Sequence, residues 1–391
     1  MIASDPFPQN AAQVGRTCCS APASGISETI AVRGCAAAQP YLPHRLPTLL
    51  VLLIAFLTGC TTSSTPATSL RRFESSEPQM GVPFRIVLYA TNQSHANAAA
   101  EATFARIRRL NEILSDYEYD SELSTLSRSS GFGTNVAVSP ELWFVLSRAQ
   151  ELSRRTDGAF DITVGPVVSL WRKARREKRL PDPARLAEAM QSVGWTNLVL
   201  DARTHSARLL RASMRLDLGG IAKGYAADEA LKVLKRHGIT RALVAADGDI
   251  TTADAPPGKR GWRIEVPALD VTNAPTARHL LLRHAAVSTS GDLFQHVEID
   301  GVRYSHIVDP KTGLGLTDHS LVTIVARDGI TSDSHSKPSS ILAPTKALQF
   351  IEATPGLAGL IVRKPGGRIE VMESSRFKRW LDVEPGKPVS R

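Results

Sequence analysis

The sequence predicts an α+β protein. Amphipathic helical segments and short apolar strand segments follow one another without a regular βαβ alternation. Of the 391 residues, 42% are hydrophobic and 22% are charged, which is ordinary globular composition with ample material for a core. The sequence contains no internal repeat. We therefore expect a mixed sheet with flanking helices, in a single large domain of two subdomains.

Each predicted element has a local justification. Strands are assigned to short apolar runs that end at turn residues, and helices to segments with apolar residues at three- and four-residue spacing. In chain order, we expect a strand at 84–90, helices at 96–115 and 141–156, an apolar run at 162–171 broken by Gly165-Pro166, a helix at 183–193, strands at 197–200, 207–210 and 215–218, a helix at 225–237, and strands at 241–246, 262–266, 285–289, 302–308 and 321–326.

The basic charge of the chain does not by itself indicate a nucleic-acid partner. The net charge is +9, but Lys and Arg are scattered, with one dense cluster at 172–179. No aromatic residues are interleaved with that cluster for base stacking, so a solvated helix face is the better interpretation. No nucleic-acid motif accompanies it, and we expect no nucleic-acid partner.

The N-terminal part carries all four cysteines, at Cys18, Cys19, Cys35 and Cys60. An apolar stretch at 49–57, too short to span a bilayer, leads to Leu57-Thr58-Gly59-Cys60. This pattern resembles a bacterial lipoprotein signal with its lipobox, and the resemblance implies lipidation of Cys60. The alternative is a buried apolar strand with a chance cysteine. We expect a protein that is lipid-anchored to a membrane of the bacterial cell envelope and faces the periplasm or exterior.

These features divide the chain into five parts. We expect an N-terminal extension at 1–43 that is excluded from the fold, a signal peptide at 44–60, a tether at 61–75, the folded domain at 76–375 and a C-terminal tail at 376–391.

The stretch Leu216 to Asp228, L-D-L-G-G-I-A-K-G-Y-A-A-D, reads as a strand end, a glycine turn and a helix start. Such a turn leaves backbone N–H groups free to face an anion, so a diphosphate can sit there; a tight connection with no ligand is the other interpretation. His306 can accept a proton from an attacking hydroxyl or can be structural. Asp333 is either a hard-cation ligand or a helix N-cap, and the local sequence favours the N-cap.

Further motifs are modest when taken singly. They include D-G-A-F-D-I-T at 157–163, D-G-D-I at 247–250, S-T-S-G-D at 288–292 and H-I-V-D-P-K-T-G at 306–313. Together with M-G-x-x-F at 80–84, L-S-D-Y-E-Y-D-S-E-L-S-T-L at 114–126 and the glycine turn, the ordered series resembles the bacterial FAD:protein FMN transferase family, also called ApbE. The resemblance extends from Met80 to about Ile361.

The resemblance implies an enzyme that cleaves the diphosphate of FAD, attaches FMN through a phosphoester to a Thr or Ser of an acceptor protein with an FMN-binding domain, and releases AMP. The base corresponds to His306. The FAD contacts correspond to Met80, Tyr117, Ala159, Phe160, Asp161, Asp217, Lys223, Ile307 and Val308. The ligands of the metal ion, normally Mg²⁺, correspond to Gly220, Asp333 and the position of Lys337.

The sequence departs from the family pattern at that last position. The family's A-D-A-L-A-T is replaced by S-D-S-H-S-K at 332–337, so Lys337 stands where the ligand threonine is expected. A protonated ammonium cannot ligate Mg²⁺ and repels it. Either the lysine turns away and water completes the metal shell, or its charge replaces part of the metal's role. Asp247 also stands where the family usually has glycine.

Two other functions stay open from the sequence. The same fold can act as an FAD diphosphatase that releases FMN and AMP, with water in place of the acceptor hydroxyl. It can also be a non-catalytic FAD-binding lipoprotein whose site has changed around Lys337.

Overall fold

The structure of the protein is a computed structural model that describes residues 69–269, 278–292 and 295–382. These residues all belong to one compact unit, as expected for a single large domain. The predicted N-terminal extension, the signal peptide with Cys60 and most of the predicted tether lie outside the described residues. Within the described residues, no helix is both long enough and apolar enough to cross a membrane.

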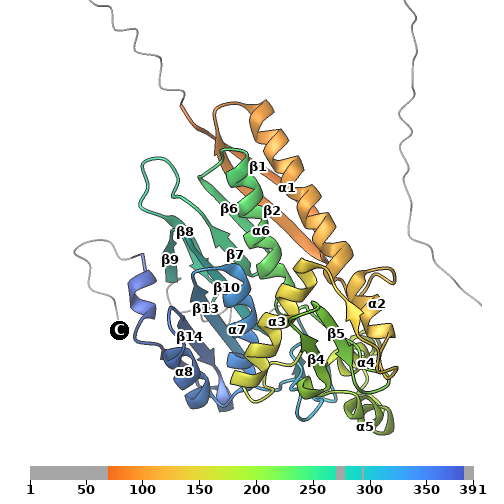
Figure 1. Ribbon diagram of the computed structural model, residues 1–391. Coiled ribbons are helices and arrows are strands. Elements are labelled where there is room, and N and C mark those ends of the chain that lie inside the picture. The colour runs from red at the N-terminus through yellow and green to blue at the C-terminus, as the bar shows by residue number, and fades with distance from the viewer. Residues whose placement is uncertain (1–68, 270–277, 293–294, 383–391) are drawn as a thin grey trace, which may run out of the picture. The chain divides into compact units, whose positions relative to one another are not determined.

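An eight-stranded sheet forms the framework of the domain (Figure 1). Every pair of neighbouring strands in it is antiparallel. In spatial order the strands are β1 (Arg71–Gln79), β2 (Val82–Ala90), β6 (Ala242–Ala246), β7 (Asp249–Thr252), β10 (Ala285–Gly291), β13 (Ser320–Ala326), β14 (Ala358–Arg363) and β15 (Glu370–Glu373). The α+β prediction is confirmed, while the expected mixed sheet is antiparallel in each described ladder. Two of these pairs, β1–β2 and β6–β7, are joined by tight turns, which require antiparallel strands.

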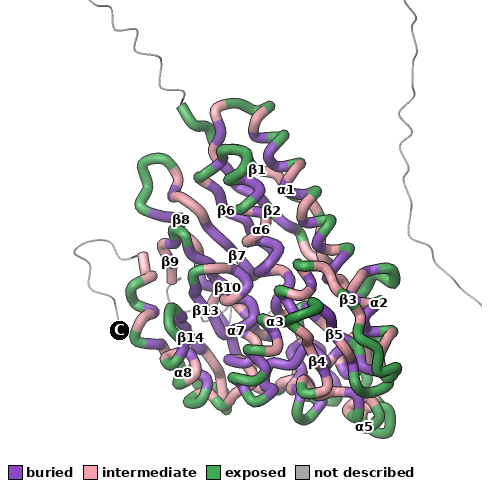
Figure 2. Tube along the Cα trace, in the orientation of Figure 1, coloured by how far each residue is buried: buried purple, intermediate pink, exposed green. Residues whose placement is uncertain are grey.

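Helices cover one face of this sheet. They are α1 (Gln93–Leu114), α6 (Ala222–Arg236), α7 (Gly329–Ile341) and α8 (Pro344–Ala353). On the other face lies the hairpin of β8 (Trp262–Val266) and β9 (Arg278–Leu282). In β6, Ala242, Val244 and Ala246 belong to the helix-side core, whereas Leu243 and Ala245 pack with Trp262. This covering of both faces explains why β6 is a continuous apolar run, and Figure 2 shows the central strands as buried.

Most of the remaining elements lie beside the sheet. They comprise the small sheet of β3 (Val136–Ala137), β5 (Ser206–Leu209) and β4 (Leu198–Asp201), the hairpin of β11 (His296–Ile299) and β12 (Val302–Ser305), the helices α2 (Glu122–Arg128), α3 (Pro140–Arg155), α4 (Gly165–Glu177) and α5 (Pro183–Gln191), and the 3-10 turn η1 (Trp195–Asn197). Two further 3-10 turns belong to the large sheet: η2 (Pro365–Gly367) connects β14 to β15, and η3 (Phe377–Trp380) packs against β14 and β9. The hydrophobic core runs without interruption from Phe84 in β2 to Leu209 in β5.

Two helices that carry site residues meet at glycines. A Cβ on Gly224 of α6 would lie 2.1 Å from the carbonyl oxygen of Gly329 at the start of α7. Only glycine permits this approach of the two backbones. The helix α7 begins after Asp328, whose side chain accepts the N–H of Thr331 as an N-cap. The contact fixes the distance between the turn before α6 and the inner face of α7.

Several predicted boundaries need correction. Residues 71–75 of the predicted tether belong to β1, because their backbone pairs with β2. Part of the predicted C-terminal tail is also folded: Phe377 in η3 is fully buried against Ala358 and Leu360. The segment 215–218 is not a strand, since only an isolated bridge joins Arg215 to Val164. The apolar run at 162–171 becomes the start of helix α4, because Pro166 suits a helix N-terminus.

Candidate active site

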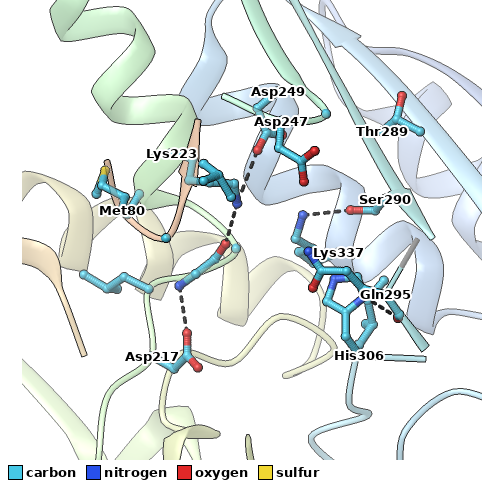
Figure 3. A pocket seen from close by; sticks show the side chains of 18 of the residues that line it. Met80, Asp217, Lys223, Asp247, Asp249, Thr289, Ser290, Gln295, His306 and Lys337 are labelled. Carbon is cyan, nitrogen blue, oxygen red and sulfur yellow. Dashed lines mark hydrogen bonds and ion pairs between the residues drawn. The ribbon is translucent and has the colours of Figure 1, made fainter. Parts of the chain in front are cut away.

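A cavity of about 860 Å³ lies where the glycine turn before α6, the β6–β7 turn, β10 and α7 come together. This volume is within the range of small-molecule and cofactor sites, about 300 to 1,000 Å³. Its wall also includes the β1–β2 turn, the loop after α1, one side of α4 and the segment after β12. Segments from distant parts of the chain thus build one site, part of which is shown in Figure 3.

Nearly all site residues predicted from the sequence line this cavity. They are Met80, Tyr117, Ala159, Phe160, Asp161, Asp217, Gly220, Lys223, His306, Ile307, Val308 and Lys337. Asp333 is fully buried and lies behind Lys337. The structure therefore brings the predicted set together, although it changes what several members can do.

The glycine turn uses most of its own N–H groups internally. The N–H of Gly219 donates to Asp217 Oδ1 at 2.8 Å, and those of Ile221 and Ala222 donate to the carbonyl of Leu218. The N–H of Gly224 donates to Asp333 Oδ2 at 3.0 Å. The expectation of a row of free backbone donors is therefore wrong in large part. Positive charge for an anion must come from side chains.

Lys223 supplies one such charge. Its Nζ atom donates to the carbonyl of Gly219 at 3.1 Å and lies 3.3 Å from Asp249 Oδ2. Burial opposes the charge, but Asp249 and Asp333 raise the pKa of Lys223 well above its usual value. Burial and the nearby Asp333 raise the pKa of Asp249, against the effect of Lys223. Lys223 is therefore a permanent cation on the cavity wall.

Arg172 connects three parts of the site. Its guanidinium donates to Asp116 Oδ2 at 2.5 Å and to Asp217 Oδ2 at 2.9 Å. It also lies 4.0 Å from the centre of the Tyr117 ring, a cation–π distance. Burial and Asp116 raise the pKa of Asp217, and the charge of Arg172 opposes this. Arg172 thus holds the carboxylate of Asp217 in place while Tyr117, 72% exposed, stands at the mouth.

Asp161 and Phe160 both line the cavity, but they have different roles. Both carboxylate oxygens of Asp161 accept hydrogen bonds from the protein, Oδ1 from Thr163 and Oδ2 from the N–H of Trp195 at 2.9 Å. Burial raises the pKa of this carboxyl group, against those hydrogen bonds. Asp161 therefore holds the loop, and Phe160 supplies the apolar surface next to it.

Asp333 and Lys337 form a buried ion pair on successive turns of α7. The Nζ atom of Lys337 donates to Asp333 Oδ1 at 3.2 Å, to Ser290 Oγ at 2.7 Å and to Ser336 Oγ at 3.2 Å. Burial would raise the pKa of Asp333, but Lys223 and Lys337 lower it overall. The local prediction that Asp333 is an N-cap is wrong: it lies inside the helix, and Asp328 is the cap.

The residues at this position do not fit a divalent cation. The carboxylate oxygen of Asp333 that faces the site already accepts the Lys337 ammonium, which carries no lone pair for a metal. No group of three or more His, Cys, Asp or Glu side chains suited to a metal ion occurs within residues 69–269, 278–292 and 295–382. The sequence left open whether Lys337 turns away from the site or points into it. In the structure it points into the site, toward Ser290 (Figure 3).

His306 is placed as a neutral base. Its Nδ1 donates to the carbonyl of Gln295 at 3.1 Å, so Nε2 carries the lone pair. Burial and the charge of Lys337 lower the pKa of His306 to about 4. The ring is therefore uncharged at neutral pH. It lines the same cavity as Lys223 and Lys337 and can accept a proton there.

The backbone conformation at Asp247 explains why the resemblance implies glycine at this position. Its φ is 57°, in the left-handed region, at the turn between β6 and β7. Glycine adopts this conformation freely and Asp tolerates it better than most residues. The side chain is exposed at the edge of the cavity.

The sequence analysis did not assign Arg172 to the site, and it noted Asp116 and Ser290 only as members of the motifs at 114–126 and 288–292. Arg172 belongs to the basic cluster that was interpreted as a solvated face. Its signal was present in the spacing: Val164, Val168, Arg172 and Arg175 all line the cavity and are three or four residues apart. This spacing is one face of helix α4, so an arginine in register with apolar residues was the available clue.

The residues of this site all lie within the part of the chain that matches a known protein family. The model of the ApbE family matches residues 80–361. The FAD:protein FMN transferase of Haemophilus influenzae is 31% identical over 286 residues, covering 72% of this chain and 82% of that protein. The FAD:protein FMN transferase of Salmonella typhimurium is 29% identical and covers 84% of this chain and 96% of that protein.

Solved structures show the same fold. The flavin transferase ApbE from Vibrio cholerae aligns with a TM-score of 0.72 at 26% identity, over 80% of this chain and 100% of that one. The crystal structure of the ApbE protein from Thermotoga maritima aligns with a TM-score of 0.70 at 29% identity, over 79% of this chain and 99% of that one.

Proposed function

Because this chain belongs to the ApbE family, we propose that it is an FAD:protein FMN transferase. The observation that carries the proposal is the placement of a neutral His306 in one cavity with the cations Lys223 and Lys337. Transfer of a phosphoryl group needs a positioned nucleophile, neutralisation of charge and a base for the attacking hydroxyl. The cavity supplies the second and third from this chain, and the acceptor protein supplies the hydroxyl.

In the proposed reaction, a Thr or Ser oxygen of the acceptor attacks the phosphorus on the FMN side of the FAD diphosphate. The new bond joins this oxygen to phosphorus, and the bond from phosphorus to the oxygen of the AMP phosphate breaks. His306 Nε2 takes the hydroxyl proton. The products are the FMN phosphoester of the acceptor and AMP. A pKa near 4 makes His306 a weak base that is always available, so its work is to direct the proton rather than to ionise the hydroxyl beforehand.

The other cavity residues would hold FAD. Phe160, Ile307 and Val308 offer apolar surface, and Tyr117 offers an aromatic ring at the mouth. Asp217, fixed by Arg172, can accept a hydrogen bond from the cofactor. Met80, in the tight β1–β2 turn with φ 51°, also lines the cavity.

Mg²⁺ is not part of the proposed steps. The resemblance implies a magnesium ion between Gly220, Asp333 and position 337, and such an ion would have to displace the Lys337 ammonium from Asp333. We also propose, from the Leu57 to Cys60 lipobox pattern, that Cys60 is lipidated and anchors the protein to a membrane of the cell envelope.

One assay tests the proposal. The full-length chain in detergent is incubated with FAD and an acceptor domain that carries the threonine to be modified, and the acceptor is examined by in-gel flavin fluorescence. A fluorescent acceptor and free AMP are expected. Free FMN and AMP without labelling would indicate a diphosphatase, and intact bound FAD would indicate a binding protein.

A further inference from the structure

The side chain of Lys337 is fixed in the site along its whole length. A Cβ on Gly220 would lie 2.9 Å from Lys337 Cγ and 3.4 Å from Cε, so the aliphatic stem packs on the glycine turn. The ammonium group has three oxygen partners, and the side chain remains 19% exposed on the cavity wall. A lysine held in this way presents its charge to a ligand without a large loss of conformational freedom.

The hydroxyl of Ser336 supports this lysine directly. The resemblance implies alanine at 336 and threonine at 337, whereas this chain has Ser336 and Lys337. Ser336 Oγ donates to the carbonyl of Asp333 at 2.7 Å and is 3.2 Å from Lys337 Nζ, which can donate to it. Ser290 Oγ lies 2.8 Å from the same hydroxyl. A methyl group at 336 could not accept from the ammonium. Ser336 and Ser290 therefore form a connected set of hydroxyl groups around the Lys337 ammonium.

The charge of the site changes with the replacement. Lys223 offsets Asp249, and Lys337 offsets Asp333, so these four groups carry no net charge. With a threonine at 337 and a divalent cation, the same site would carry one positive charge. The lysine site thus attracts a diphosphate less strongly than the metal site would, but it needs no metal to do so.

We propose that the Lys337 ammonium contacts the diphosphate of FAD and takes the place of the divalent cation in this site. The proposal rests on the proposed function, because FAD is the ligand it invokes. The contact to Ser336 at 3.2 Å is the one that a phosphate oxygen can replace, since that hydroxyl keeps its bond to the Asp333 carbonyl. Lys337 makes and breaks no covalent bond in the transfer step; it offsets charge on the diphosphate.

The test compares FAD binding by the full-length wild-type chain and three variants, measured by flavin fluorescence anisotropy in EDTA and in excess Mg²⁺. The wild-type dissociation constant is expected to be the same in both buffers within about twofold. Lys337→Met is expected to weaken binding about tenfold or more in both, because it removes a charge-assisted hydrogen bond. Lys337→Thr is expected to bind FAD as weakly as Lys337→Met in EDTA, and to recover the wild-type affinity for FAD in Mg²⁺. Lys232→Met removes an exposed lysine of α6 and is expected to match wild type.

A second measurement reports the metal directly. Electron paramagnetic resonance of Mn²⁺, used in place of Mg²⁺, is expected to show bound ion with Lys337→Thr and FAD, and free ion with wild type and FAD. Thermal unfolding of each variant shows that it is folded. A wild-type affinity that falls about tenfold or more in EDTA would overturn the proposal, as would wild-type affinity in Lys337→Met.

The outcomes separate this inference from the proposed function. Acceptor labelling by wild type that requires Mg²⁺ would remove the role of Lys337 and leave the transferase function standing. FAD binding with the expected pattern but no acceptor labelling would support the role of Lys337 and overturn the transferase function. Absence of FAD binding in every buffer would overturn both.

Discussion

Replacement of Arg172 by leucine is expected to destabilise the fold and weaken FAD binding together. The guanidinium pairs with Asp116 at 2.5 Å and with Asp217 at 2.9 Å, and the three side chains are only 16%, 7% and 10% exposed. Removal of one partner of a buried pair leaves the other charges without compensation, at a cost of about 3 to 5 kcal/mol. Because these groups keep some contact with water, we expect a loss of about 3 kcal/mol in the free energy of unfolding.

The assay is urea unfolding followed by tryptophan fluorescence, with FAD affinity measured in parallel. Arg172→Lys keeps the charge but loses the planar fork that reaches both carboxylates, so it should fall between wild type and Arg172→Leu. Arg176→Leu, at an exposed position of the same helix, is the control for lost positive charge. If Arg172→Leu unfolds within about 0.5 kcal/mol of wild type, as an ordinary surface substitution does, the reasoning about this ion-pair cluster is refuted.

The remaining predictions concern the base, a buried histidine and the helix crossing. His306→Ala should lower the rate of acceptor labelling about a hundredfold or more while FAD still binds; an unchanged rate would remove His306 as the base. The pKa of His306 is about 4, so the wild-type labelling rate should show no inflection near pH 6.5, and an inflection there would contradict the placement. His335 in α7 has a pKa lowered to about 4, first by burial and then by Arg155, and its Nε2 has no hydrogen-bond partner in the described part of the chain. Since its folded pKa lies below the unfolded value, the neutral ring stabilises the fold above about pH 6.5 and this stability is lost as the pH falls toward 4. We therefore compare the free energy of unfolding in urea of His335→Leu with that of wild type at two pH values. The difference, variant minus wild type, should be about 2 kcal/mol larger at pH 5 than at pH 8, and an equal difference at the two pH values would contradict this. Gly224→Ala should cost about 3 kcal/mol in thermal unfolding because its Cβ meets the Gly329 carbonyl, and a melting temperature equal to that of wild type would contradict the close approach.

The sequence predicted strands well where a short run rich in apolar residues stands between turn residues. Strand β8 was predicted at 262–266, and β6 was predicted within one residue of its start. Strand β1 was missed because its sequence, R-R-F-E-S-S-E-P-Q, is that of an exposed edge strand with few apolar residues. The N-cap interpretation of Asp333 implied a helix that begins after residue 333, whereas α7 begins at Gly329. The start was misplaced because α7 is rich in serine and contains Pro338, so its burial depends on hydroxyl bonds to neighbouring backbone rather than on an apolar stripe.

The site was predicted through the order of its motifs, whereas its contacts required the structure. Once 329–341 is known to be a helix, the four-residue spacing puts Asp333 next to Lys337, but no spacing indicates that the N–H of Gly224 donates to the other carboxylate oxygen of Asp333. The pairing of Arg172 with Asp217 joins residues 45 positions apart and depends on how α4 packs beside the glycine turn. Sequence reasoning could place an unexpected lysine at 337 but could not say which way it points.

Whether this protein transfers FMN is decided by the intact mass of the acceptor domain after incubation with the full-length protein and FAD, with AMP quantified in the same sample. We expect an acceptor heavier by one FMN less one water, with one AMP released for each modified acceptor, and no such product with His306→Ala. AMP and free FMN with an unmodified acceptor, or intact FAD with neither product, would contradict it.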